Sequence, residues 1–78
     1  MLPKSLDDDF FTHVRSELLP YCVNDVVEIT RGVYSGRRGA VVVLDRSSDK
    51  PKFLVEFGDG TDELVTVDDL KLIERGDA

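Results

Sequence analysis

The sequence has 78 residues, a formal net charge of −6, one cysteine and no tryptophan. This length suits one small domain, whose core leaves little room for a deep, dry active site. A single cysteine excludes an internal disulfide, and no apolar run approaches the roughly 20 residues of a membrane span. The opening MLPKSLDDDFF lacks the apolar core of a signal peptide, so we expect a cytoplasmic protein without a membrane partner.

Charge is unevenly distributed along the chain. Residues 31–52 carry six bases and two acids, a net of +4, whereas the remainder carries a net of −10. The overall acidity disfavours a general affinity for nucleic acid or anionic lipid, because both are polyanions. The basic segment is the part of the chain that supports the alternative of a nucleic-acid contact.

The first predicted element is a helix over roughly residues 5–18. Ser5 is a suitable N-cap, and acids follow in the first turn, where the helix dipole favours negative charge. Apolar residues recur at every fourth position, namely Leu6, Phe10, Val14 and Leu18. Because so short a helix is unstable alone in water, we expect this face to pack on the rest of the chain. The alternative is docking on a second copy or on another protein.

Five short antiparallel strands are predicted after residue 25. They cover residues 26–30, 39–45, 52–57, 63–67 and the short segment 72–73. Asp59-Gly60 is a strong hairpin signal between the third and fourth strands. The stretch 68–70 predicts a single 3₁₀ turn with Asp68 as its cap, and the tail 75–78 is expected to fray.

Five such strands bury an apolar face best by curling into a small barrel, which also limits free edges. We therefore predict a mainly β fold: a five-stranded barrel with an N-terminal α-helix and a 3₁₀ turn before the last strand. The expected organisation is one domain over residues 1–78. Its parts are a helical segment (5–19), the barrel (24–74) and the tail (75–78).

The stretch ITRGVYSGRRGAVVVL places three glycines and two arginines directly before a strand. Glycines allow the tight return between the first two strands of a small barrel. The positions that match the spacing of a KOW motif are Asn24, Asp25, Val27, Ile29, Gly32, Gly36, Gly39 and Val41. The downstream FLVEFGDGTDELVTVDDLKLIE is similar to the second half of many SH3-like barrels. Residues 24–74 thus resemble the KOW-like, SH3-like domains of bacterial ribosomal proteins and transcription-elongation factors, which implies that fold and binding to RNA or the transcription–translation machinery.

The basic loop supplies the candidate partner-binding residues. They are Arg31, Tyr34, Arg37, Arg38 and Lys52. Arginines suit phosphates and Tyr34 suits stacking on a base, whereas the alternative is that the arginines pair with the acidic remainder of the surface. Because the chain is acidic, we expect a protein partner, with KOW-type RNA binding as the alternative.

The remaining polar residues indicate no catalytic chemistry. His13 is the only histidine, and Cys22 is expected to be a small buried group, so no nucleophile–base pair is predicted. The acids around Asp59 lack the spacing of a calcium loop. We therefore expect a non-enzymatic interaction module with no cofactor and no metal, either a monomer or a homodimer through the helix. A third hypothesis is an immunity-type inhibitor of a toxin, whose acids at residues 7–9 mimic phosphate.

Overall fold

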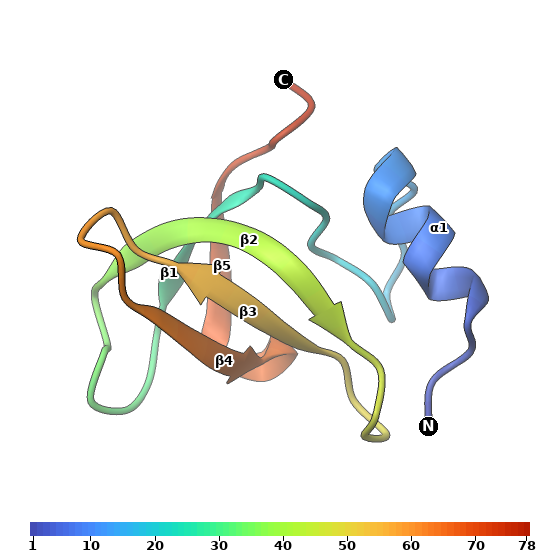
Figure 1. Cartoon of the computed structure of the whole chain (residues 1–78), viewed down its shortest axis with the longest axis horizontal. Helices are drawn as coiled ribbons and strands as arrows, with labels where there is room; N and C mark the ends of the chain where they lie inside the picture. Colours follow the sequence, from blue (N-terminus) through green and yellow to red (C-terminus); the bar gives the residue numbers. More distant parts are fainter.

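The computed structural model describes all 78 residues of the chain. One short helix precedes five strands, and a single 3₁₀ turn stands before the last of them (Figure 1). The prediction of a mainly β fold with this element order is confirmed. The helix is α1 (Ser5–Thr12), the strands are β1 (Val26–Ile29), β2 (Arg38–Asp45), β3 (Lys52–Glu56), β4 (Asp62–Thr66) and β5 (Leu70–Glu74), and the 3₁₀ turn is η1 (Val67–Asp69).

All five strands belong to one antiparallel sheet in the order β4-β3-β2-β1-β5. β2 is the longest strand, and Figure 1 shows it arching across the others. An irregularity between Val41 and Val43 in its pairing with β3 accompanies this bend, as bulges do in curved sheets. The end strands β4 and β5 do not hydrogen-bond to each other, so the sheet curls into a barrel that is not closed.

A single apolar core joins the helix to the sheet. The side chain of Phe10 on α1 is fully buried, and its ring centre lies 6.3 Å from that of Phe53 on β3. Tyr21, between the helix and β1, packs edge-on against Phe53 and donates its hydroxyl hydrogen to the Leu70 carbonyl at 2.8 Å. The helix therefore buries Leu6 and Phe10 in the core of its own chain, whereas Phe11 is exposed. The core residues are Leu2, Leu6, Phe10, Leu19, Cys22, Val27, Ile29, Val41, Phe53, Val55, Phe57, Val65 and Leu70.

The helix is shorter than predicted at its C-terminal end. His13 adopts a left-handed conformation with φ of 61°, and the Val14 N–H donates to the Asp9 carbonyl at 2.9 Å. This bond is typical of a helix C-terminus, where it satisfies a carbonyl that has no partner inside the helix. The predicted continuation to residue 18 is wrong, and Ser5 is the first helical residue and not the N-cap.

The apolar spacing misled the prediction because it continues past this stop. Phe10 is buried, but Val14 is 54% and Leu18 is 42% exposed. Leu19 enters the core instead, and its N–H donates to the Ser16 hydroxyl at 3.0 Å, which fixes the turn that redirects the chain. In the segment after the helix, Leu19 is thus buried in the core, whereas Val14 and Leu18 of the predicted helical face remain exposed.

The tail does not fray as predicted. The Gly76 N–H donates to the Asp25 carboxylate at 2.8 Å, and Arg75 forms an ion pair with Asp77 at 2.8 Å. A Cβ at position 76 would lie 2.5 Å from the backbone of Asn24, so only glycine fits this contact without a shift. The 3₁₀ turn also differs in detail, because it starts at Val67 and no side chain caps it.

Candidate functional site

The glycine-rich loop between β1 and β2 is held by its own backbone. Ile29 donates its N–H to the Arg37 carbonyl at 2.9 Å and accepts the Gly36 N–H at 2.7 Å. Gly32 and Gly36 have φ values of 87° and 91°, a region that other residues rarely adopt. The Thr30 N–H donates to the Asp69 carbonyl, which ties the base of the loop to η1. The loop therefore has a defined shape before any ligand arrives.

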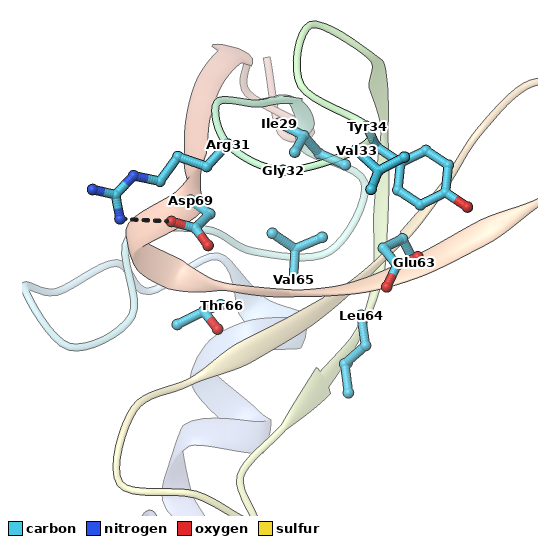
Figure 2. Close-up of a pocket in the computed structure, with 10 residues that line it drawn as sticks. All are labelled: Ile29, Arg31, Gly32, Val33, Tyr34, Glu63, Leu64, Val65, Thr66 and Asp69. Atoms are coloured by element: carbon cyan, nitrogen blue, oxygen red, sulfur yellow. Dashed lines mark ion pairs between the residues drawn. The ribbon is translucent and has the colours of Figure 1, made fainter.

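A groove of about 320 Å³ separates this loop from β4. Figure 2 shows Ile29, Val33 and Tyr34 on the loop side, with Val65 and Glu63 directed toward them from β4. Val65 is buried at the floor, whereas Val33 on the rim is 97% exposed. Contact with a partner would remove this apolar side chain from water, which is favourable. Leu64 and Thr66 also line the groove at β4, and Figure 2 shows their side chains on the side away from the loop.

Of the five predicted binding residues, Arg31 and Tyr34 line the groove. The Arg31 guanidinium lies 3.6 Å from the Asp69 carboxylate at the η1 end, and its side chain is 76% exposed. The centre of the Tyr34 ring lies 5.8 Å from that of the Phe57 ring, and the residue is 37% exposed. These two residues supply one cation and one aromatic surface to the rim.

Arg37 lies behind Tyr34 and not in the groove. Its guanidinium sits 4.1 Å from the centre of the Phe57 ring and forms an ion pair with Asp59 at 2.8 Å. Asp59 also accepts hydrogen bonds from the Thr61 hydroxyl and N–H. Together the Thr61 bonds and then Arg37 lower the pKa of Asp59 to about 2. The positive charge of Arg37 is therefore matched by a carboxylate that is ionised at neutral pH.

Arg38 and Lys52 lie outside the groove. Arg38 stands opposite Glu28 in the β1–β2 ladder, and their side chains form an ion pair at 3.0 Å. Lys52 stands opposite Asp45 in the β2–β3 ladder. All three loop arginines thus have a carboxylate partner, which is the arrangement that the sequence left open as the alternative to a phosphate contact. Exposed pairs of this kind are weak, so they neutralise the surface more than they immobilise it.

The groove residues of β4 were not predicted as site residues. The alternation in FLVEF and ELVTV predicts the strands and indicates which side chains face inward. It contains no signal for which strand ends the sheet, because that depends on long-range pairing. Glu63, Leu64 and Val65 line the groove on β4, which lies at one end of the strand order.

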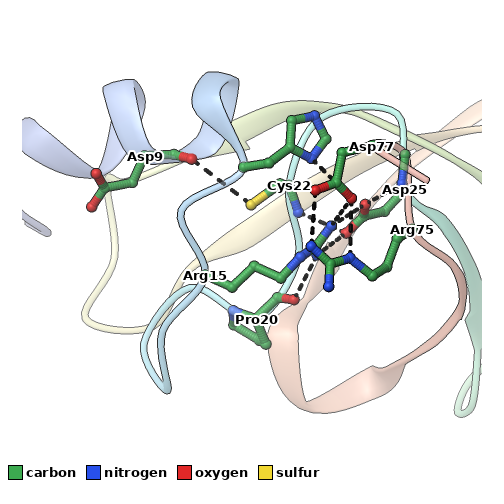
Figure 3. A network of polar contacts seen from close by, with 9 residues as sticks. Asp9, Arg15, Pro20, Cys22, Asp25, Arg75 and Asp77 are labelled. Carbon is green, nitrogen blue, oxygen red and sulfur yellow. Dashed lines mark hydrogen bonds and ion pairs between the residues drawn. The ribbon is translucent and has the colours of Figure 1, made fainter.

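The other end of the molecule is held by a buried ion pair that the sequence did not reveal (Figure 3). Asp25 has no exposed surface and accepts hydrogen bonds from both terminal nitrogens of Arg15. The backbone N–H groups of Cys22 and Gly76 donate to the same carboxylate, each at 2.8 Å. Burial acts to raise the pKa of Asp25, but these bonds outweigh it and leave the pKa below its usual value.

Two of the acids at the helix start are less available than predicted. Asp7 forms an ion pair with Arg46 at 2.9 Å, and the same arginine donates to the Leu2 carbonyl. Asp9 uses its backbone carbonyl to close the helix and lies partly buried. The acidic face over residues 7–9 is thus reduced to the exposed Asp8 and a paired neighbour.

The fold and the groove define a small mainly β protein with a surface groove beside a loop that its own backbone bonds hold. No group of three or more His, Cys, Asp or Glu side chains is placed to hold a metal ion. α1 is the only α-helix, and it lacks the length and apolar character needed to cross a bilayer. No protein-family model matches the chain, and no curated protein matches it.

Proposed function

We propose that this protein is a non-enzymatic interaction module that binds another protein through the groove between the glycine-rich loop and β4. The observation that carries the proposal is Val33, which is 97% exposed at the rim of a groove with apolar residues at its floor. The loop is held by its backbone bonds, so binding requires little ordering of the chain. A partner that covers this rim would bury apolar surface that now faces water.

Two buried groups support the non-enzymatic part of the proposal. Cys22 has no exposed surface, and burial is the main cause that raises the pKa of its thiol, so the reactive thiolate is disfavoured. The thiol makes a long hydrogen bond to the Asp9 carbonyl and presents no sulfur to the surface. His13 Nδ1 is likewise buried, with Asp77 as its nearest carboxylate at 3.9 Å.

The charge of the loop favours a protein over RNA as the partner. The guanidinium groups of Arg31, Arg37 and Arg38 each face a carboxylate of the same chain. A phosphate backbone would have to compete with these carboxylates and approach a molecule of net charge −6. KOW-type RNA binding, implied by the resemblance of residues 24–74, therefore remains the alternative outcome of the test.

The test is capture from a nuclease-treated lysate of the source organism with three immobilised proteins: the native chain, Val33→Asp and Val14→Asp. Val14 is 54% exposed but follows the helix and lies outside the groove, so its substitution is a matched control. We expect one protein to be retained by the native chain and by Val14→Asp and lost with Val33→Asp. The purified partner should then bind in calorimetry with the same pattern.

Two results would contradict the proposal. Equal retention by Val33→Asp would remove the groove as the binding site. Labelled single-stranded RNA that binds with a steep salt dependence, and that is lost with Arg37→Ala and Arg38→Ala, would replace the protein partner with a nucleic acid. Circular dichroism of each variant establishes that the fold is retained.

A further inference from the structure

The backbone of β4 has hydrogen-bonding groups that point away from the sheet. The Phe57 N–H donates to the Thr61 carbonyl at one end of the β3–β4 ladder, and the Val67 N–H donates to the Pro51 carbonyl at the other. Hydrogen-bonded pairs alternate with non-bonded pairs in antiparallel sheets. The residues of β4 that bond to β3 are therefore Glu63 and Val65, while the N–H and C=O groups of Asp62, Leu64 and Thr66 point outward.

These outward groups have no partner within the chain. β4 pairs only with β3, and no backbone hydrogen bond outside the helices and strands uses them. The other end strand is less accessible, because the Leu70 carbonyl of β5 accepts a hydrogen bond from the Tyr21 hydroxyl. The open barrel thus has one edge on which three alternate residues each have an unused N–H donor and an unused C=O acceptor.

The groove lies along this edge and has room for an added strand. Neighbouring strands run about 4.8 Å apart, so a strand beside β4 would occupy the space that the loop rim encloses. Alternate side chains of such a strand would point toward Val65 at the floor and toward Val33 and Tyr34 on the rim. The edge supplies the backbone bonds, and the groove supplies a place for apolar side chains.

The charges around the edge identify what kind of strand fits. Asp62 and Glu63, at the start of β4, have no ion-pair partner in the chain, whereas Asp69 at the other end is paired with Arg31. An added strand is therefore favoured when its residues beside Asp62 and Glu63 are lysine or arginine. At the opposite end of β4, the positive charge of Arg31 would repel a basic residue of the added strand.

The same charges argue against a second copy of this chain as the occupant. Antiparallel self-pairing through Leu64 would bring Asp62 and Glu63 of each copy toward the acidic η1 turn of the other. Parallel self-pairing would place Asp62 opposite Asp62. Like charges opposed across a sheet are destabilising, and charged side chains at an edge are a common protection against self-association.

We propose that the free edge of β4 takes up an extended segment of a partner protein as a sixth strand, and that this segment alternates apolar residues and is basic at the end beside Asp62 and Glu63. This inference rests on the proposed function and specifies how the groove binds. Each of the three outward residues offers one donor and one acceptor to the segment. The backbone bonds provide affinity for any extended chain, and the charges select a basic one.

The test uses the native chain and two capped seven-residue peptides, TVTVKVK and its matched control TVTVEVE. Amide hydrogen exchange is followed by nuclear magnetic resonance. At about 90% saturation with the lysine peptide, exchange at Leu64 and Thr66 should slow by about tenfold, because an amide exchanges only while its hydrogen bond is absent. The amides of Glu63 and Val65, which already bond to β3, serve as internal references. The glutamate peptide should bind at least tenfold more weakly.

Variants of the edge separate backbone bonding from side-chain contact. Leu64→Pro removes an outward donor that β3 does not use, and proline is tolerated at such edge positions. We expect it to bind the lysine peptide at least tenfold more weakly than Leu64→Ala, which keeps the N–H. If Leu64→Pro fails to fold, protection of the Leu64 and Thr66 amides in the native chain decides the backbone bonding. The surface variant Asp62→Lys then tests the charge preference, because Asp62 lies on the face of β4 opposite to Val65 and should be beside the peptide lysines; the preference for the lysine peptide should be lost.

The outcomes distinguish this inference from the proposed function. No binding of the lysine peptide, or binding that leaves the Leu64 and Thr66 amides unprotected, overturns strand addition. Neither result alters whether Val33→Asp loses a captured protein. Protection of the same amides without peptide, together with a dimer in sedimentation, would identify a second copy as the occupant and likewise overturn the inference.

Discussion

The two ends of this molecule use the same kinds of charged residue for different purposes. Around Asp25, an arginine and two backbone N–H groups converge on one buried carboxylate and tie the C-terminal tail to the segment between α1 and β1. Around the groove, the pairs of Arg31 with Asp69 and of Arg37 with Asp59 lie in water. Asp25 has no freedom to meet a partner, whereas the exposed pairs are weak enough to be exchanged for contacts with one. Burial, and not residue type, separates the end around Asp25 from the groove end.

The largest loss in the free energy of unfolding is expected from Asp25→Asn. The substitution removes the charge that balances Arg15, whose side chain is only 19% exposed. Breaking a buried pair by neutralising one partner typically costs about 3–5 kcal/mol, which is a large part of the stability of a small domain. Urea unfolding followed by circular dichroism measures this loss.

The matched control is Asp59→Asn at the groove end. Its ion pair with Arg37 is exposed, so the midpoint of urea unfolding should change far less than for Asp25→Asn. Equal losses for the two variants would show that burial does not distinguish the two ends. The proposed difference between the buried ion pair of Asp25 and the exposed ion pair of Asp59 would then be wrong.

The sequence indicated the sheet but not this difference between its ends. Strand periodicity depends on neighbouring residues, which is why the first four strands were predicted to within one residue at each end. The fifth was predicted only as residues 72–73, whereas β5 runs over Leu70–Glu74. The sequence places Asp25 in the Asn24-Asp25 pair of the KOW-like motif and Arg15 in the predicted helix. In the structure, that helix ends at Thr12, before Arg15. Their contact joins positions ten residues apart through a turn at Ser16, and no local pattern encodes it. The open edge of β4 was missed for the same reason, since it is defined by the absence of a long-range pairing.

Gly76→Ala is expected to have an intermediate effect at the buried end. The new Cβ would lie 2.5 Å from the Asn24 carbonyl carbon and 2.6 Å from the Val23 oxygen, and neither backbone atom moves easily. Forced contacts of this kind cost about 1–3 kcal/mol. We expect the tail to leave Asp25 and the Gly76 N–H to lose its protection from hydrogen exchange.

Gly58→Ala is the corresponding change near the groove. Nothing lies within 4 Å of a Cβ at position 58, and its φ is not in the left-handed region. The variant should be as stable as the native chain or slightly more so, because alanine has fewer conformations to lose on folding. A loss equal to that of Gly76→Ala would contradict the distinction between a tightly packed and an open end.

At the buried end, acid is expected to destabilise the protein less than either substitution, and it tests the same carboxylate without changing the packing. The pKa of Asp25 is lower in the folded chain than in the unfolded chain, so the unfolded state takes up the proton first as the pH falls. The stabilisation from Asp25 is complete above its ordinary pKa near 4 and disappears as the pH approaches the lower, folded value. The loss amounts to about 1.4 kcal/mol for each unit by which folding lowers the pKa.

Urea midpoints between pH 5 and pH 2 measure this dependence, and Asp25→Asn isolates it. Asp77, whose pKa is held at about 2 mainly by Arg75, belongs to the same network but stays in the variant. The native chain should therefore lose stability more steeply than Asp25→Asn over this range. Parallel curves would mean that Asp25 binds its proton equally well in both states, and the ordered tail would then need another cause than this carboxylate.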